Sequence, residues 1–313
     1  MKSAITLLLG VALVLPLSAA EEGEKSFEFK DGDSLVLLGG TQLERDQRSG
    51  HLETALTLAL GEKKLVVRNL AWSGDTVDGD ARSYFGPPAE GLTRLEAQLE
   101  LIKPSVVLLN YGADIAHGGL KGLPGFLTSY RSLLDLIRKK SPEVRLIITS
   151  PTPLENLGSP LPDQTDANKN LQALSKALKE LAAAQSAYFI DWFHLMGGPG
   201  KAGRASTPLT ENGIHYTAAG FAKLAAVTVK ALGLPPADVP LAATEPIRQA
   251  VIKKDFLFFN RYRPQNETYL FGFRKHEQGQ NAKEIPMFDP LVTQSDEAIH
   301  QAKIKALAEA RRP

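Results

Sequence analysis

Short apolar runs alternate with longer amphipathic segments through most of the chain. Five runs rich in Val, Leu and Ile predict β-strands at residues 34–39, 65–70, 105–111, 145–150 and 187–192. Segments with helical spacing of apolar residues follow them, at residues 51–60, 92–102, 126–140, 166–184 and 218–232. Several of the strand-like runs are apolar on both faces, which is typical of parallel strands covered by helices. The pattern predicts an α/β protein, a three-layer α/β/α sandwich around a five-stranded parallel sheet.

The composition changes in the last quarter of the chain. Residues 235–246 hold four prolines in twelve positions, which predicts a linker or wrapping segment. Beyond it, residues 256–272 are dense in aromatic side chains and residues 296–312 predict a helix. About 70 residues are marginal for an independent hydrophobic core. We therefore expect residues 235–313 to form a C-terminal extension packed on a domain of residues 21–234.

The first twenty residues have the pattern of an export signal. Lys2 precedes an apolar run at residues 4–16, and the small residues 18–20 match the positions that a signal peptidase reads. The apolar run is shorter than the roughly 20 residues of a transmembrane helix. We expect residues 1–20 to be a signal peptide cleaved after Ala20, although a retained anchor or a buried helix would fit the same run. The mature protein would be periplasmic or extracellular, with no integral membrane segment.

Charge and composition exclude several kinds of protein. The 313 residues contain 36 Lys and Arg, 35 Asp and Glu, and no Cys. A net charge of +1 without basic clusters provides no attraction for nucleic acids. The absence of Cys excludes disulfide scaffolds, thiolate zinc sites, iron–sulfur clusters and a cysteine nucleophile. We predict no metal and no cofactor, because Gly39-Gly40 lacks the spacing of a nucleotide loop and the histidines outside the candidate site lack metal-ligand spacing: His51, His117, His194, His276 and His300.

Four short polar segments mark the places where a parallel sheet would bind ligands, because such sites lie at the carboxyl ends of the strands. Three follow predicted strands, and the fourth precedes the last predicted helix of the domain: Gly39-Gly40-Thr41-Gln42, Trp72-Ser73-Gly74-Asp75, Tyr111-Gly112-Ala113-Asp114 and Asn212-Gly213-Ile214-His215. In order and position they resemble the four motif blocks of the SGNH (GDSL-type) hydrolases, over residues 31–234. Asn69 and the segment 210–221 also fit those blocks. The Gly-Gly-Thr sequence and the Arg-Tyr-Arg-Pro sequence at 261–264 resemble a secreted group with altered blocks.

The resemblance implies a flavodoxin-like sandwich of SGNH type and a set of candidate catalytic residues. The family contains esterases, lipases and carbohydrate deacetylases. By position, Thr41 stands for the nucleophilic Ser, His215 for the general base and Asn212 for the acid that orients it. Gly74 and Asp114 stand where the family has the oxyanion-hole Gly and Asn. Gly74 and His215 match the family in residue type, whereas the other three differ.

Each departure from the family pattern has a chemical consequence. A Thr hydroxyl can attack a carbonyl once a base takes its proton, but its methyl group crowds the approach. Asn212 cannot stabilise an imidazolium and can hold the wrong tautomer, and the same exchange in a serine protease costs about 10⁴ in turnover. Asp114 would repel a developing oxyanion, where losing one donor alone costs about 10²–10³.

Two rearrangements would rescue catalysis. Asp114 could serve as the carboxylate partner of His215 while Asn212 acts as a donor. Alternatively, Ser73 could replace Thr41 as the nucleophile with the same base.

Purely structural roles are also open for these residues. Thr41, Asp75 and Thr76 could stabilise turns or cap helices, and Asp114 could be an ordinary loop carboxylate. The basic residues of the extension fit a packed or solvated face, and their interleaving with aromatic residues also fits sugar stacking or anion binding: Arg261, Arg263, Arg274 and Lys275.

The sequence therefore predicts a secreted hydrolase of carboxylic esters, with a small-molecule or carbohydrate O-acyl ester as substrate. The alternative is a binding or scaffold protein that kept the sandwich and lost the chemistry. The two hypotheses differ in whether the Thr41 hydroxyl and the His215 ring meet in one hollow able to accept an acyl group.

Overall fold

The computed structural model describes residues 26–84, 86–198 and 207–311. The predicted signal peptide lies outside these residues. No helix in the described ranges is long and apolar enough to cross a bilayer.

The five predicted strands form one parallel sheet, as expected. The strands are β1 (Asp33–Gly39), β2 (Leu65–Asn69), β3 (Val106–Asn110), β4 (Arg145–Thr149) and β5 (Tyr188–Ile190). Their order in the sheet is β2-β1-β3-β4-β5. The chain first adds β2 on one side of β1 and then β3 on the other, so the order reverses at β1. A crevice opens at the carboxyl ends of β1 and β3, where ligands bind in folds of this kind.

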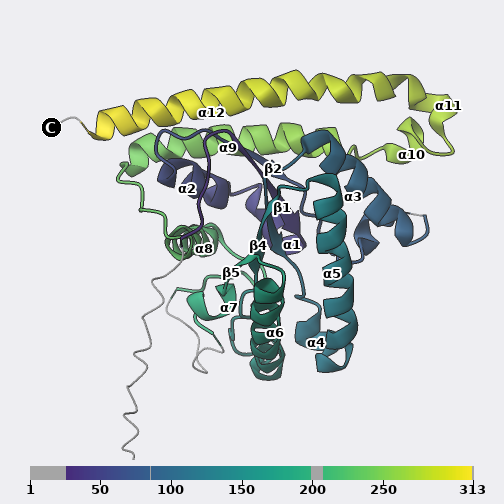
Figure 1. Ribbon diagram of the computed structural model, residues 1–313, viewed down its shortest axis with the longest axis vertical. Helices are drawn as coiled ribbons and strands as arrows, with labels where there is room; N and C mark the ends of the chain where they lie inside the picture. The colour runs from purple at the N-terminus through teal and green to yellow at the C-terminus, as the bar shows by residue number, and fades with distance from the viewer. Residues whose placement is uncertain (1–25, 85, 199–206, 312–313) are drawn as a thin grey trace, which may run out of the picture.

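Helices cover both faces of the sheet and confirm the three-layer sandwich (Figure 1). Alternate residues of β1 belong to two separate cores, because successive side chains of a strand point to opposite faces. Leu35 and Leu37 pack with α2 (His51–Ala59) and α8 (Ala218–Ala231). Val36 and Leu38 pack on the other face, with helices that contribute most of that core: α3 (Ala89–Ile102), α5 (Leu123–Lys140) and α6 (Thr165–Ala184).

Close packing of the end of β1 against β3 places the residues that follow β1 in the crevice. A Cβ atom on Gly39 would lie 2.4 Å from the carbonyl oxygen of Asn110 on β3, so this position requires glycine. The Gly40 N–H donates to the same oxygen at 3.3 Å. Helix α1 (Thr41–Asp46) begins at the following residue. Thr41 is therefore held at the carboxyl edge of the sheet.

The prediction of a linker over residues 235–246 is wrong in its second half. Helix α9 (Leu241–Tyr262) begins at Leu241 and includes Pro246. Proline removes one helical hydrogen bond, but the residues that follow it, Ile247 and Val251, are fully buried. Burial of such side chains contributes about 1.5–3 kcal/mol each, which offsets the lost bond.

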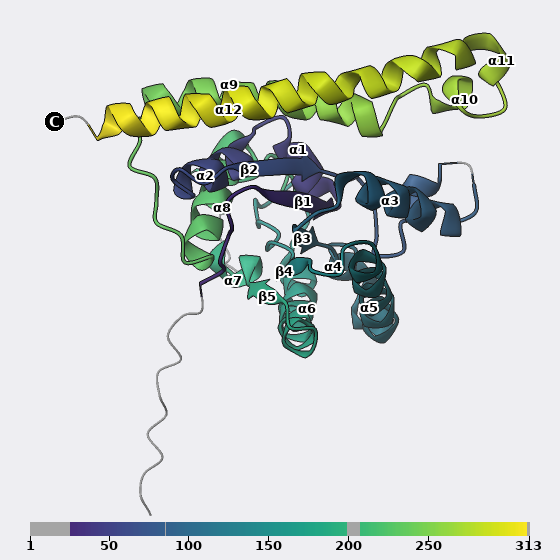
Figure 2. The same cartoon turned by 45° about the horizontal axis from the view of Figure 1, so that its top comes forward.

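The extension is a long antiparallel helical pair that lies along the β2 edge (Figures 1 and 2). Its second helix, α12 (Phe288–Ala310), begins well before the predicted residue 296. The short helices α10 (Glu267–Leu270) and α11 (Lys275–Gln278) and the 3₁₀ segment η3 (Gly279–Met287) join the pair. α9 packs against α12, α2 and β2, and its Phe258 and Tyr262 belong to the same core as Val36.

Buried charges fasten the extension to the sandwich. The Lys254 ammonium group of α9 is fully buried, 2.6 Å from a carboxylate oxygen of Glu53 on α2 and 2.8 Å from one of Asp255. It also donates to the carbonyl of Val67 on β2 at 3.1 Å. Arg68 of β2 donates two hydrogen bonds to Asp296 of α12, at 2.9 and 2.6 Å. Removing one partner of such a buried contact strongly destabilises the fold, because the other group is left buried without a partner.

Candidate active site

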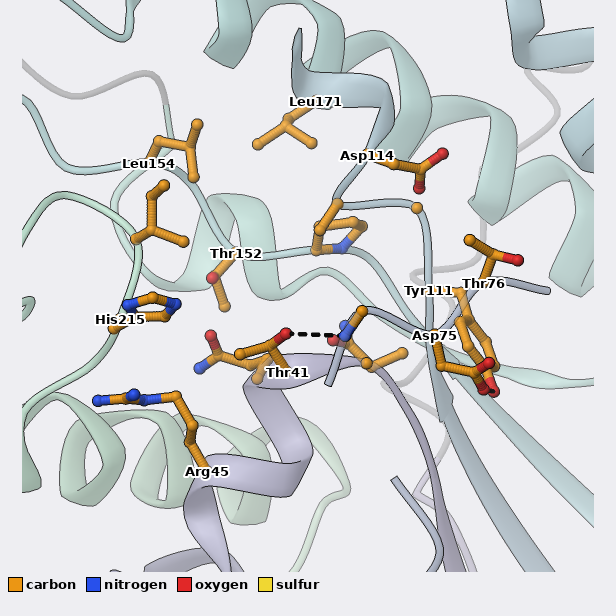
Figure 3. Close-up of a pocket in the computed structure, with 18 residues that line it drawn as sticks. Thr41, Arg45, Asp75, Thr76, Tyr111, Asp114, Thr152, Leu154, Leu171 and His215 are labelled. Atoms are coloured by element: carbon orange, nitrogen blue, oxygen red, sulfur yellow. Dashed lines mark hydrogen bonds between the residues drawn. The ribbon is translucent and has the colours of Figure 1, made fainter. Parts of the chain in front are cut away.

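A cavity of about 210 Å³ opens at the carboxyl edge of the sheet. Figure 3 shows the side chains that line it, which come from the segments after β1, β2, β3 and β4, from α6 and from the segment before α8. Thr41, Gly74, Asp114 and His215 all line this cavity, so four of the five predicted site residues share it. The fifth, Asn212, is not a lining residue, but its amide group contacts the ring of His215. Ser73, the alternative nucleophile, is not among its lining residues.

The Thr41 hydroxyl lies beside the backbone of Gly74. The N–H of Gly74 donates to the Thr41 hydroxyl oxygen at 3.3 Å (Figure 3). Thr41 is half-buried, so its hydroxyl can be reached from the cavity. No hydrogen bond joins Thr41 to His215 in the part of the chain that the structure describes. Thr41 and Gly74 thus place a hydroxyl oxygen beside an N–H donor, and acyl transfer needs both an attacking oxygen and such a donor.

Gly74 owes its position to a tight turn. Its φ of +78° lies in the left-handed region, which glycine adopts without steric cost. The Asp75 N–H closes the turn on the carbonyl of Trp72 at 3.0 Å. A side chain at this position would strain the turn and move the N–H that faces Thr41.

Asp75 lines the cavity, and its buried carboxylate stabilises the turn. Its carboxylate accepts hydrogen bonds from Arg82 at 2.6 Å and from the Tyr111 hydroxyl at 3.0 Å. Burial raises the pKa of Asp75 despite the neighbouring Arg82. Thr76 donates to Asp80 at 2.5 Å. These contacts favour the structural interpretation of Asp75 and Thr76.

Asn212 determines the tautomer of His215. The amide oxygen of Asn212 accepts the backbone N–H groups of Ile214 at 3.2 Å and His215 at 3.0 Å. These two donors leave the amide nitrogen to face His215 Nδ1, at 3.1 Å. The NH₂ group must donate in this pair, so Nδ1 accepts and the neutral ring carries its proton on Nε2. In this state His215 is a hydrogen-bond donor and cannot take a proton at Nε2.

Asp114 stands apart from Thr41 and His215. It is exposed, and no ion pair or side-chain hydrogen bond to it occurs in the described residues. In Figure 3 its carboxylate is turned away from Thr41 and His215. The proposed exchange of roles between Asp114 and Asn212 is not supported, since Nδ1 of His215 is held by Asn212.

The cavity also contains residues that the sequence analysis did not select. Arg45 lies one helical turn after Thr41, a spacing that would have placed it on the same face of α1; it forms an ion pair with Glu211 at 3.1 Å. One wall is apolar, and no sequence signal connected its members: Pro151, Leu154, Leu171 and Ile214. No group of three or more His, Asp or Glu side chains within the described ranges is placed to hold a metal ion.

Comparisons with known proteins bear on the family and the fold. The model of the GDSL-like Lipase/Acylhydrolase family matches residues 32–223. None of the curated proteins compared matches the sequence.

Several solved structures are similar in fold. A gut microbial diltiazem-metabolizing enzyme (BT4096) is 13% identical, with 93% of this chain and 98% of that chain covered at a TM-score of 0.60. A GDSL-like lipase from Parabacteroides merdae is 16% identical, with 67% and 100% covered at a TM-score of 0.50. A catalytic mutant of an acetylxylan esterase from Geobacillus stearothermophilus is 18% identical, with 66% and 97% covered at a TM-score of 0.48. At these identities the first two likenesses show the fold alone. The first of them extends over most of the C-terminal extension as well.

Proposed function

The chain belongs to the GDSL-like lipase/acylhydrolase family, and on that premise we propose that it hydrolyses carboxylic esters with short acyl groups. The observation that carries this proposal is the shared cavity, in which the Thr41 hydroxyl, the Gly74 N–H and the His215 ring surround one small space. Thr41 would attack the acyl carbonyl. The N–H groups of Gly74 and Thr41 would stabilise the oxyanion.

His215 needs a change of tautomer before it can act as the base. For Nε2 to accept the Thr41 proton, Nδ1 must carry a proton and face the amide oxygen of Asn212. That oxygen now binds two backbone N–H groups. Turning the amide breaks those bonds, so we expect a low rate compared with enzymes that have an acid at this position. After acylation, His215 would give the proton to the leaving alcohol, and water would release the acid from Thr41.

The walls of the cavity support a choice of substrate. Leu154, Leu171 and Ile214 form an apolar surface suited to a short acyl chain. Arg45, Thr76 and Asp114 supply polar groups around it, which suit a hydroxyl-rich alcohol. We propose an O-acyl group on a carbohydrate as the substrate. The signal-like N-terminus supports a place of action outside the cytoplasm, where such polymers are found.

The test is the release of p-nitrophenol from p-nitrophenyl acetate by the purified mature protein. Thr41→Ala and His215→Ala are each expected to remove the catalysed rate. Thr128→Ala, on the exposed surface of α5, is the matched control and should retain it. Equal rates for the wild type and both site variants would rule out the proposed site.

One observation favours a second function, the binding of an acylated sugar without hydrolysis. The orientation of the Asn212 amide makes His215 a donor, which suits recognition of an ester carbonyl rather than proton abstraction. In that case calorimetric titration with an acetylated xylo-oligosaccharide would give heat of binding, and no acetate would be released. His215→Ala would weaken the binding.

A further inference from the structure

Two consecutive residues of the C-terminal extension contact the loop that carries Gly74. The Tyr262 hydroxyl donates to the carbonyl oxygen of Ala71 at 2.8 Å. Arg263 donates to a carboxylate oxygen of Glu44 at 2.9 Å. Its guanidinium group also lies 3.8 Å from the centre of the Trp72 ring. The extension thus touches the chain on the residues directly before the oxyanion glycine.

The sequence around Arg263 explains its position. Helix α9 ends at Tyr262, and Arg263 has φ −134° and ψ 66°. Pro264 follows, and a residue before proline is disfavoured in the helical conformation. Arg263 therefore leaves the helix axis at the point where α9 passes the loop after β2.

Glu44 joins Arg263 to the reacting groups. Glu44 lies on α1, three residues after Thr41, and its carboxylate accepts the backbone N–H of Ser73 at 2.5 Å. The oxygen that accepts this N–H is the one that Arg263 contacts. The next N–H along the chain, that of Gly74, donates to the Thr41 hydroxyl. One carboxylate therefore ties the helix of the nucleophile to the loop of the oxyanion donor.

We propose that Arg263 is a positioning residue of the active site, which holds the loop 72–74 through Glu44 and Trp72 so that the Gly74 N–H faces Thr41. The inference rests on the proposed ester hydrolysis for its effect on rate. It makes the C-terminal extension a part of the active site, although no residue of the extension lines the cavity.

Gly74 is exposed, and its own hydrogen bond to Thr41 is long, at 3.3 Å. Its place therefore depends on its neighbours. Without the guanidinium group, the half-buried Glu44 carboxylate would lose its cation and gain by turning to water, and Trp72 would lose its closer cationic partner. Misplacement of about 1 Å costs about 10² in rate, because oxyanion donors act only at hydrogen-bond distance.

The experiment compares Arg263→Gln with Arg263→Lys and Arg261→Gln. Arg261 lies at the end of the same helix but pairs with Asp289 across the extension, at 2.7 Å, so its variant controls for the loss of a charge. Arg263→Lys keeps the charge beside Glu44 and should rescue part of the effect. Two measurements are made on the full mature chain: kcat and KM for p-nitrophenyl acetate, and hydrogen exchange by mass spectrometry of peptides that span residues 71–75 and β3.

Arg263→Gln is expected to lower kcat by about 10- to 100-fold, with KM changed less than about twofold. It should also speed exchange over residues 71–75 and leave β3 unchanged. Arg261→Gln should match the wild type in both measurements. Unchanged kcat and unchanged exchange in Arg263→Gln would overturn the proposal. So would faster exchange in β3 to the same degree, because that shows a general loss of stability.

Failure of the proposed function gives a different result. If the wild type does not hydrolyse the ester, ester hydrolysis is refuted and exchange alone decides the role of Arg263. Faster exchange confined to residues 71–75 would then support its positioning of the loop. Unchanged exchange would refute it.

Discussion

Asn212 differs from aspartate by one amide group, and that group decides which nitrogen of His215 carries the proton. Its oxygen is occupied by two backbone N–H groups, so its NH₂ faces the ring. An aspartate in the same place could accept both backbone N–H groups with one oxygen and Nδ1–H with the other. An aspartate at position 212 would therefore keep both backbone contacts and change the chemistry only at the ring.

Asn212→Asp is expected to raise ester hydrolysis at least about tenfold. The carboxylate would hold Nδ1–H, leave Nε2 free to accept the Thr41 proton and stabilise the imidazolium. The measurement is kcat/KM for p-nitrophenyl acetate at neutral pH.

Asn266→Asp, which makes the same change of charge on the exposed extension, serves as the control and should leave kcat/KM unchanged. If Asn212→Asp hydrolyses no faster than the wild type, the tautomer of His215 does not limit the reaction.

At the scale of elements, α2 and α9 meet at a buried cluster in which two carboxyl groups share one lysine. Glu53 and Asp255 both contact Lys254, and all three side chains are buried. Burial raises the pKa of Glu53 to about 8, against the attraction of Lys254. Burial also raises the pKa of Asp255. Arg68, Asp296 and Asp46 also face this cluster. A carboxyl group of the cluster thus keeps its proton in the folded protein at neutral pH.

This arrangement predicts a pH dependence of stability that belongs to Glu53. The folded state holds its proton up to about pH 8, whereas the unfolded chain releases it near 4.5. The contribution of Glu53 to the free energy of unfolding is therefore full below pH 4.5 and declines as the pH rises to 8. The slope is about 1.4 kcal/mol per pH unit at most.

Urea unfolding of the wild type and Glu53→Gln between pH 5 and 8 tests this dependence. The variant should gain stability relative to the wild type as the pH rises, because its amide does not ionise. The exposed Glu62→Gln should run parallel to the wild type. A constant difference between the wild type and Glu53→Gln would contradict the raised pKa.

For the whole molecule, the C-terminal extension is continuous with the sandwich. Phe258 and Tyr262 of α9 and Val292 of α12 lie in the same buried cluster as the strands. The buried contacts of Lys254 with Glu53 and of Arg68 with Asp296 cross the same boundary. The extension also contacts the loop of Gly74 through Tyr262 and Arg263.

We therefore expect the chain to unfold in a single cooperative transition. Calorimetry of the mature protein should give a van't Hoff enthalpy equal to the calorimetric enthalpy, because the two parts share one core. Circular dichroism at 222 nm, which is dominated by the helices, should follow the same transition as tryptophan fluorescence from Trp72 and Trp192. Two transitions, with the helical pair melting first, would show that the extension is a separate unit.

The sequence predicted the strands closely because their signal is local. The run at residues 105–111 is short, mostly apolar and rich in Val and Leu, which is typical of a parallel strand covered on both faces. The start of α9 was missed because prolines at 235–246 indicate a break, and only burial of Ile247 and Val251 outweighs it. Thr41, Gly74 and His215 could be selected because motif order and parallel topology bring the carboxyl ends of strands together.

Hydrophobic periodicity and chain order determined the layered fold, the edge of the sheet where a site would form and the segments that meet there, since these follow from local pattern and from the rules of parallel sheets. The tertiary structure alone decided which way the Asn212 amide faces, where Asp114 turns and what Arg263 holds. The Asn212 amide is oriented by the three-dimensional shape of its own turn. The contact of Arg263 with Glu44 joins residues 219 positions apart in the chain. Periodicity contains no information on such contacts, because they depend on the packing of whole elements and not on the spacing within any one of them.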